Sequence, residues 1–136
     1  MGENWRVTRL KAEHLLAPEL QAFVPPQLTK LAVLLSWDEL GGAARVAFSG
    51  DRIAGLFAIS PEHELLAYVV PAFRRQGLAS DGLQDLMRRT VADRGETRFV
   101  ATAKIGEPGE YVARSLSMNE VSRTDKEISF DLNVPA

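Results

Sequence analysis

The spacing of apolar residues in the first part of the chain indicates one strand followed by helices. Residues 5–10 alternate between apolar and polar positions, as a strand does. Residues 12–23 carry apolar side chains on one side of a helix, which Pro18 should break or restart. A second helix is expected over residues 27–40, where leucines recur at helical spacing. The pair of glycines that follows should end it.

The next three segments are short, alternate in polarity and are joined by turn sequences. They are expected to be strands and span residues 43–48, 52–59 and 63–70. The connections Ser49-Gly50-Asp51 and Ser60-Pro61-Glu62 are short enough for hairpins, which predicts an antiparallel meander. Gly55, inside the middle strand, indicates a bulge or a close approach of another backbone.

The second half of the chain contains its clearest helix. After Pro71, apolar residues form one stripe at Leu78, Leu83, Leu86, Met87 and Val91. Gly95 is suited to the position after its last turn. The remaining elements are expected to be a strand at 98–103, a loop at 104–109, a short helix at 110–116 and a strand at 127–132. This order predicts one domain, residues 1–136, of the α/β class (α+β type), with a mixed and mostly antiparallel sheet flanked by helices.

Composition narrows the classes of function. With 46% hydrophobic and 25% charged residues among 136, the chain is typical of a single globular domain. A net charge of −2 argues against a general nucleic-acid or polybasic membrane binder. There is no cysteine, and the two histidines lie far apart, so we expect neither a thiolate nucleophile nor a multi-histidine metal site. No apolar stretch of about 18 residues and no apolar signal core occurs, so a cytoplasmic protein without a membrane segment is expected.

One stretch, Leu65 to Ser80, combines a strand, a basic turn and the start of the strongest helix. The first turn of a helix leaves backbone N–H groups unpaired, and the helix dipole adds about half a positive charge there. Gly77 and Ala79 are small enough to let an anion approach the backbone, and Arg74 and Arg75 add positive charge beside it. The stretch therefore suits a phosphate or pyrophosphate.

Pro71 affects the strand that leads into this turn. Because proline has no N–H, pairing with the next strand should weaken at this point. The main-chain groups of Tyr68, Val69 and Val70 would then be free to pair with an amide-bearing ligand, as in strand addition.

The turn is part of a longer motif, Pro71-Ala72-Phe73-Arg74-Arg75-Gln76-Gly77-Leu78-Ala79. It matches neither the dinucleotide-binding pattern G-x-G-x-x-G nor the P-loop. It resembles the acyl-CoA-binding motif of the GNAT-type N-acetyltransferases, whose core is Gln/Arg-x-x-Gly-x-Gly/Ala. The resemblance extends from about Ala43 to Leu132 and implies the GNAT-like acyl-CoA N-acyltransferase fold.

The resemblance also implies a co-substrate, acetyl-CoA, and residues that bind it. Its pyrophosphate would lie on Arg74, Arg75, Gln76, Gly77, Leu78, Ala79 and Ser80, and its pantetheine arm along Tyr68, Val69 and Val70. The implied reaction is direct transfer of the acetyl group to a primary amine, with a base for the ammonium proton and an acid for the leaving thiolate. The acceptor would be a small-molecule amine or a protein amine. Dimers are frequent in the family, so a homodimer is one expected state.

The resemblance leaves the base and the acid less clearly marked. Family members often hold a carboxylate near the start of the cofactor-binding strand, where Glu62, His63 and Glu64 stand here, and strand alternation sets His63 and Glu64 on opposite faces. Only one of these two can therefore face the amine, and the sequence leaves open which. The usual acid is a tyrosine at the position of Ala113, and Tyr111 lies about 200° away around the same helix. The chain also departs from the family pattern at Gly106, Gly109 and Ser117.

Two other functions stay open at this stage. The departures favour an acyl-CoA-binding or regulatory module without turnover. Alternatively, the basic turn only caps a helix or binds another anion, in an α/β domain with no acyl-CoA role. Glu64, His63 and Tyr111 each also have an ordinary interpretation as a surface or packing residue.

Overall fold

The computed structural model describes residues 5–23, 33–95 and 98–134. Its strands are β1 (Trp5–Arg9), β2 (Ala43–Ser49), β3 (Arg52–Ile59), β4 (Leu65–Val69), β5 (Arg98–Lys104), β6 (Asn119–Arg123) and β7 (Glu127–Asn133). Its helices are α1 (Pro18–Phe23), α3 (Leu78–Arg94) and α4 (Pro108–Ser115), with 3-10 turns at Ala12–Leu16, Trp37–Glu39 and Pro71–Phe73. No helix within the described ranges is long and apolar enough to cross a membrane.

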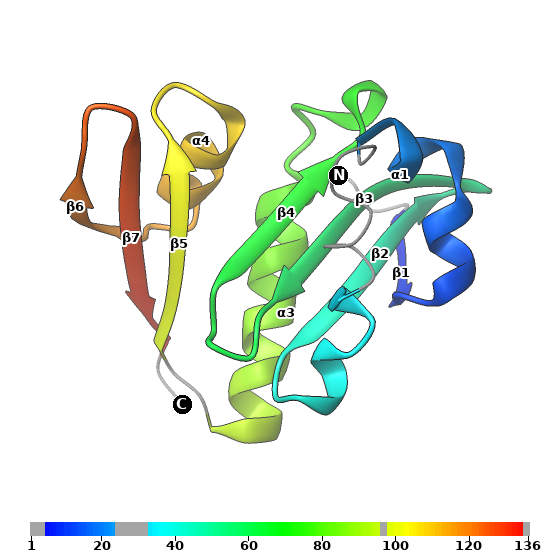
Figure 1. Cartoon of the computed structure of the whole chain (residues 1–136), viewed down its shortest axis with the longest axis horizontal. Helices are drawn as coiled ribbons and strands as arrows, with labels where there is room; N and C mark the ends of the chain where they lie inside the picture. The colour runs from blue at the N-terminus through cyan, green and yellow to red at the C-terminus, as the bar shows by residue number, and fades with distance from the viewer. Residues whose placement is uncertain (1–4, 24–32, 96–97, 135–136) are drawn as a thin grey trace.

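The strands form two antiparallel sheets that touch at one point. The first sheet has the order β1-β2-β3-β4, and the second has the order β5-β7-β6. They are joined by a single parallel bridge between Glu64, just before β4, and Val100 in β5. Beyond this bridge the two strands diverge (Figure 1). The strands as a set are therefore mixed and mostly antiparallel, as predicted, but they are divided between two sheets.

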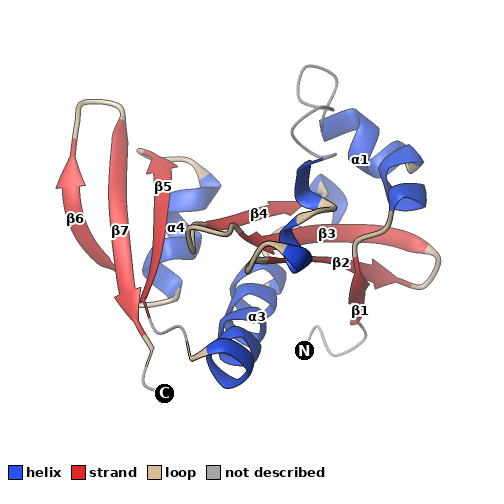
Figure 2. Cartoon of the chain, turned by 60° about the horizontal axis from the view of Figure 1, so that its bottom comes forward, coloured by secondary structure: helices blue, strands red, loops and turns tan. Residues whose placement is uncertain are grey.

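Helices cover both faces of the first sheet, and α4 packs on the second (Figure 2). Helix α3 contacts β3 and β4 on one face, whereas α1 contacts β3 on the other. Two hydrophobic cores result. The larger includes the fully buried Phe57, Phe99 and Phe130 and joins α3 and α4 to both sheets, and the smaller includes Leu20 and Leu56 on the side of α1.

Most of the predicted elements are present. The strands expected at 5–10, 43–48, 52–59, 98–103 and 127–132 correspond to β1, β2, β3, β5 and β7. Pro18 restarts the first helix as predicted, because a 3-10 turn precedes it and α1 begins with it. The helix expected over 27–40 lies outside the described residues up to residue 32, and its described part, 33–40, holds one short helical stretch and the 3-10 turn Trp37–Glu39.

Two strands differ from the prediction. β4 begins at Leu65 because Ser60 holds the preceding turn: its buried Oγ accepts the N–H groups of Glu62 (3.2 Å) and Glu64 (2.9 Å). His63 adopts a left-handed conformation in this turn, with φ +68°, and cannot continue a strand. β6 is not predicted at all. It is exposed along its whole length and pairs only with β7, so no alternation of buried and exposed positions marks it.

The packing of α3 on the first sheet depends on glycines. A Cβ on Gly82, inside α3, would lie 2.6 Å from a ring carbon of Phe57, so the ring rests directly on the helix backbone. Phe57 is only 1% exposed. A Cβ on Gly55 would lie 3.0 Å from the Tyr68 carbonyl oxygen and 3.3 Å from Leu78. The register of β2 and β3 shifts beside Gly55, which confirms the predicted bulge.

We expect Gly82→Ala to destabilise the fold. The added methyl overlaps the Phe57 ring, and overpacking of this kind costs about 1–3 kcal/mol. Alanine regains up to about 1 kcal/mol in helix propensity, so the net loss should be about 1–2 kcal/mol. Chemical denaturation measures this change in the free energy of unfolding, and the m-value should stay unchanged.

A double-mutant cycle with Phe57→Leu separates the clash from other effects of the alanine. The smaller side chain removes the ring that the new methyl would meet. Gly82→Ala should therefore cost less in the Phe57→Leu background than in the native chain. Equal costs in both backgrounds would show that the ring does not set the height of α3.

Candidate functional site

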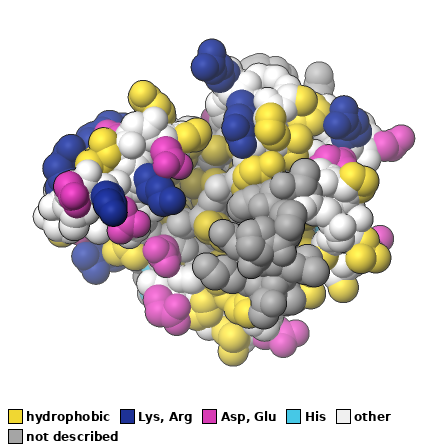
Figure 3. All heavy atoms as spheres, turned by 45° about the horizontal axis from the view of Figure 1, so that its top comes forward, with side chains coloured by type: hydrophobic (Ala, Val, Ile, Leu, Met, Phe, Trp, Pro, Cys, Tyr) yellow, Lys and Arg dark blue, Asp and Glu magenta, His cyan; other side chains and the backbone are white. Residues whose placement is uncertain are grey.

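The candidate site is the opening between β4 and β5. The Val100 N–H donates to the His63 carbonyl oxygen (3.0 Å), beside the parallel bridge at Glu64. The strands then separate well before Pro71. The prediction that the missing N–H of this proline causes the separation is therefore wrong. The separation begins where the two sheets part. The two lobes of the molecule are built on the first sheet and on the second sheet. When the end at which β4 and β5 diverge is turned forward, the surface is hollowed between these lobes, and hydrophobic side chains lie in the hollow (Figure 3).

Only alternate residues of β4 direct their main-chain groups into this opening. The Ser60 N–H donates to the Glu64 carbonyl oxygen (2.9 Å), and the Val70 N–H donates to the Ala54 carbonyl oxygen (2.8 Å). Even-numbered residues therefore pair with β3, and the groups of odd-numbered residues point away from it. Ala67 and Val69 thus face the opening. The prediction that the main chain of Val70 is free is wrong, and the same alternation directs the main chain of Tyr68 toward β3.

The turn after β4 forms a concave set of backbone N–H groups. Arg75 and Gly77 both have left-handed backbones, with φ +66° and +78°. Within α3, Asp81 is the first residue whose N–H reaches back, to the Gly77 carbonyl oxygen (2.9 Å). The N–H groups at the start of the helix, on Leu78, Ala79 and Ser80, therefore have no intrahelical acceptor. This is the geometry that binds an anion.

The space around Gly77 is open to a ligand. A Cβ at this position would meet only the Asp81 Oδ2 atom, at 3.8 Å. Arg75, Gln76 and Gly77 are exposed, whereas the side chains of Leu78 and Ala79 are buried in the larger core. The last two can contribute only their main chain. The Asp81 carboxylate lies in the same first turn and opposes part of the positive charge of the two arginines.

Arg74 makes a contact that the sequence did not reveal. Its Nε–H donates to the Val69 carbonyl oxygen (2.9 Å), and its guanidinium carbon lies 5.8 Å from the centre of the Tyr68 ring. The side chain therefore folds back onto β4. Arg75 follows it in the turn. Among the described residues, no hydrogen bond, ion pair or ring contact joins Arg75 to β4.

Ser80 joins α3 to α4 through a short hydrogen bond with Ser115. The Ser115 hydroxyl donates to the Val112 carbonyl oxygen (2.6 Å), so Ser80 must be the donor in the 2.5 Å bond between the two hydroxyl groups. The hydroxyl proton of Ser80 is consequently engaged. Only its main-chain N–H is available to an anion.

Glu64 and His63 both lie where the two sheets meet, but in different surroundings. Glu64 is exposed and, by strand alternation, lies on the same face of the sheet as Tyr68, opposite α3. The half-buried ring of His63 lies 6.1 Å from that of Phe99 in the larger core. The left-handed backbone at His63 takes this residue out of the alternation that the sequence analysis assumed.

The structure does not bring Tyr111 to the position of the expected acid. Its side chain is 69% exposed, whereas that of Ala113 is 3% exposed in the core between α4 and the sheets. On this helix, Glu110 accepts the N–H of Gly106 (2.8 Å), and this bond together with the Arg114 guanidinium lowers its pKa. The loop before α4 is therefore closed by a carboxylate of the same helix.

The outer surface of the second lobe carries charges of both signs. Arg114 pairs with Glu110 and Glu120, and Arg123 pairs with Glu120. The hydrogen bond from Arg123 lowers the pKa of Glu120 to about 2. The pair of Arg114 with Glu120 links α4 to β6. Basic and acidic side chains lie next to one another on the surface of this part of the molecule (Figure 3).

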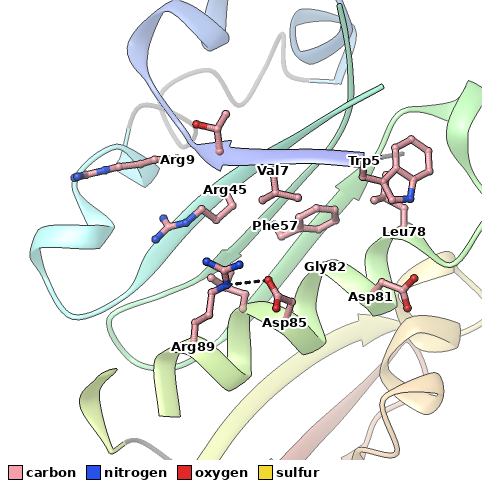
Figure 4. Close-up of a pocket in the computed structure, with 12 residues that line it drawn as sticks. Trp5, Val7, Arg9, Arg45, Phe57, Leu78, Asp81, Gly82, Asp85 and Arg89 are labelled. Carbon is pink, nitrogen blue, oxygen red and sulfur yellow. Dashed lines mark hydrogen bonds and ion pairs between the residues drawn. The ribbon is translucent and has the colours of Figure 1, made fainter. Parts of the chain in front are cut away.

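A separate cavity of about 320 Å³ lies between β1 and α3 (Figure 4). Phe57 and Leu78 line its floor, and an ion pair of Asp85 with Arg89 crosses its rim (2.9 Å). Of the predicted site residues only Leu78 lines it, so it is distinct from the opening between β4 and β5. No group of three or more potential metal ligands occurs among the described residues.

Comparison with known proteins shows which fold this is. Neither a protein-family profile nor a curated protein sequence matches the chain. Among solved structures, the RimL ribosomal L7/L12 alpha-N-protein acetyltransferase (apo) matches with TM-score 0.75 and 14% identity, over 98% of this chain and 95% of that one. The ribosomal-protein-S18-alanine N-acetyltransferase from Escherichia coli has TM-score 0.75 and 17% identity, over 97% and 95% of the chains.

A third match was solved with its ligand. The GNAT family acetyltransferase from Elizabethkingia anophelis with acetyl-CoA bound has TM-score 0.74 and 13% identity, over 97% of this chain and 99% of that one. This chain has the GNAT acetyltransferase fold. The fold implied by the motif is thereby confirmed, whereas the roles of individual residues stay predictions. The sequence could not predict which alternate residues of β4 direct their main chain into the opening, because this depends on the strand register. It could not predict the contacts of Arg74 and Ser80 either, because they depend on β4 and on a neighbouring helix.

For the GNAT-fold anion site we expect Gly77→Glu to weaken acetyl-CoA binding about tenfold or more. The substitution puts bulk and negative charge where the N–H groups converge, and each tenfold corresponds to about 1.4 kcal/mol. Gly95→Glu is a matched control. Gly95 has φ +72° at the other end of the same helix, with nothing within 4 Å of a Cβ, so it carries the same backbone strain. Calorimetric titration measures both. If both variants lose the same affinity for acetyl-CoA, backbone strain alone explains the effect of Gly77→Glu.

Proposed function

We propose that this chain is an N-acetyltransferase that moves the acetyl group of acetyl-CoA to a primary amine. The observation that carries the proposal is the continuity of two features. The open edge of β4, at Ala67 and Val69, leads directly into the anion-binding turn that ends at Gly77. A ligand with an amide-bearing arm and a diphosphate needs these two features in this order. One neighbour of the same fold was solved with acetyl-CoA bound.

The residues fit the two parts of this co-substrate. Arg74, Arg75 and the N–H groups from Leu78 to Ser80 supply positive charge and donors for the diphosphate. The N–H and carbonyl groups of Ala67 and Val69 supply the hydrogen-bonding edge for the pantetheine amides. Tyr68 and Val70 would support this edge from β3, and Gln76 borders it from the turn. Acetyl-CoA, when bound, supplies the acetyl group as a thioester.

Glu64 is the better of the two candidates for the base. It is exposed at the junction of the sheets, where an amine can reach it, whereas the ring of His63 packs beside Phe99. The Ser60 Oγ holds the Glu64 main chain in place (2.9 Å). A carboxylate so placed would take the ammonium proton directly or through one water molecule, and positioning would supply most of the remaining rate enhancement.

No tyrosine acid is required for this proposal. Ala113 cannot donate a proton, and Tyr111 faces solvent on α4. A thiol has an ordinary pKa of about 8.5, so a thiolate is a good leaving group near neutral pH even without a side-chain acid. The chain would then depend on the base and on positioning. The acceptor is a primary amine of a small molecule or of a protein.

Thermal unfolding with acetyl-CoA tests the binding half of the proposal. At about one hundred times its Kd, a ligand adds roughly 2.7 kcal/mol to the free energy of unfolding. For a domain of this size the Tm should rise by about 5–15 °C. ATP serves as an anion control, because it has phosphates without a pantetheine arm. A rise with acetyl-CoA alone supports the proposal, and no rise at millimolar acetyl-CoA contradicts it.

Glu64→Gln tests the catalytic half once an accepted amine has been found by CoA release. We expect kcat to fall by about a hundredfold, with the KM for acetyl-CoA unchanged, because the amide cannot accept the proton. His63→Gln is the paired variant and should retain most of kcat. The reverse outcome would assign the base to His63, and unchanged rates in both variants would exclude a base at this junction.

A further inference from the structure

The Val69 carbonyl is already occupied in the chain without ligand. Val69 is one of the odd-numbered residues of β4, whose main-chain groups point away from β3. Its carbonyl oxygen accepts the Arg74 Nε–H (2.9 Å). The same guanidinium lies toward the ring of Tyr68, at 5.8 Å from its centre. The arginine side chain therefore lies along the end of the strand edge that an amide-bearing arm would use.

We propose that Arg74 is a specificity-determining residue that closes the edge of β4 and yields it only to ligands that also carry an anionic group. The inference rests on the proposed function, because it concerns the same opening. It assigns Arg74 two exclusive positions. In one position the guanidinium bonds the Val69 carbonyl, and in the other it bonds the anion and leaves that carbonyl to a ligand amide.

The chemistry of the guanidinium supports an exchange between these positions. A neutral carbonyl is a weaker partner for an arginine than a phosphate, which forms charge-assisted and often bidentate bonds. None of the ion pairs between described residues includes Arg74. The side chain is exposed and can turn without disturbing the core. The anion site at Gly77 is only three residues further along the chain.

The consequence is a selection between ligands that share the amide arm. A neutral pantetheine compound meets the closed edge and must displace Arg74 without offering it a better partner. A nucleoside diphosphate derivative of the same arm offers that partner. The bond between Arg74 and Val69 would therefore weaken binding of the amide-bearing arm, because the arm must first displace the arginine. A diphosphate on the same ligand would remove this cost by binding Arg74 itself.

Arg75 provides a matched control. It carries the same charge in the same turn, and among the described residues no hydrogen bond, ion pair or ring contact joins it to β4. Methionine is as acceptable as arginine at its left-handed backbone, since both carry a Cβ. Arg75→Met thus removes positive charge from the anion site while leaving the contact at Val69 in place. Arg74→Met removes both, and Arg74→Lys keeps the charge but has no Nε–H in that position.

The test measures the affinity of D-pantetheine, which has the amide arm and no phosphate, by titration followed by NMR. Arg74→Met and Arg74→Lys should bind it about three- to tenfold more tightly than the native chain, the range expected for one exposed hydrogen bond. Arg75→Met should bind it like the native chain. Unchanged or weaker binding by both Arg74 variants would overturn the proposal.

A second titration uses ADP, which has the diphosphate and no arm. Arg74→Met and Arg75→Met should each lose affinity for ADP, because each lacks one positive charge at the anion site. Arg74→Lys should lose less than Arg74→Met. If Arg74→Met gains affinity for ADP as well as for pantetheine, the effect is a general opening of the turn, and the proposed selection is wrong.

The Arg74 Nε–H signal of the native chain gives an independent reading. It should be protected from exchange with solvent in the free protein and should shift when acetyl-CoA is added. Failure of the proposed function appears differently, as absence of any acetyl-CoA effect on the Tm of the native chain. Acetyl-CoA binding together with an unchanged Nε–H signal and unchanged pantetheine affinities would overturn the role of Arg74 alone.

Discussion

The contact between the Phe57 ring and the backbone of Gly82 determines how closely α3 approaches the first sheet. With no Cβ at Gly82, a fully buried aromatic ring can rest on the helix itself, 2.6 Å from where that Cβ would be. On the strand side, the missing Cβ of Gly55 likewise lets Leu78 of α3 pack close to the backbone of β3. The height and direction of α3 decide where its first turn lies. The N–H groups of Leu78, Ala79 and Ser80, which have no intrahelical acceptor, are thus positioned by packing at the middle of the helix and not by the turn alone.

The second constraint is the single junction between the two sheets. Among the described residues β4 and β5 pair only at Glu64 and Val100, so the main-chain groups of Ala67 and Val69 have no strand to bond there. A free strand edge of this kind normally invites association with another chain. Here the core that joins α3 and α4 to both sheets surrounds it on one face, and Arg74 covers part of it. The opening is therefore a consequence of the architecture, and the proposed selection of its ligand would depend on Arg74 at its edge.

Catalysis in this arrangement would rely on little more than one base and good positioning. Glu64 stands at the junction with its main chain held by Ser60, so a small number of contacts defines its place. The buried Ala113 of α4 cannot donate a proton, and the Ser80–Ser115 bond joins α3 to α4. The proposed site would therefore make more contacts for binding than for proton transfer.

The sequence by itself determined the order and type of most elements and the place of the basic turn before α3. These follow from local physics: apolar periodicity, turn residues, and a glycine where a helix begins. It did not mark β6, which has no buried face, or the left-handed backbone of His63, which lies in the turn held by the buried Ser60. Only the tertiary structure decided that the strands divide into two sheets and that odd-numbered residues of β4 face the opening. It also decided that Arg74 lies on Val69. Register and contacts between segments depend on partners distant in the chain, and no local pattern of residues carries that information.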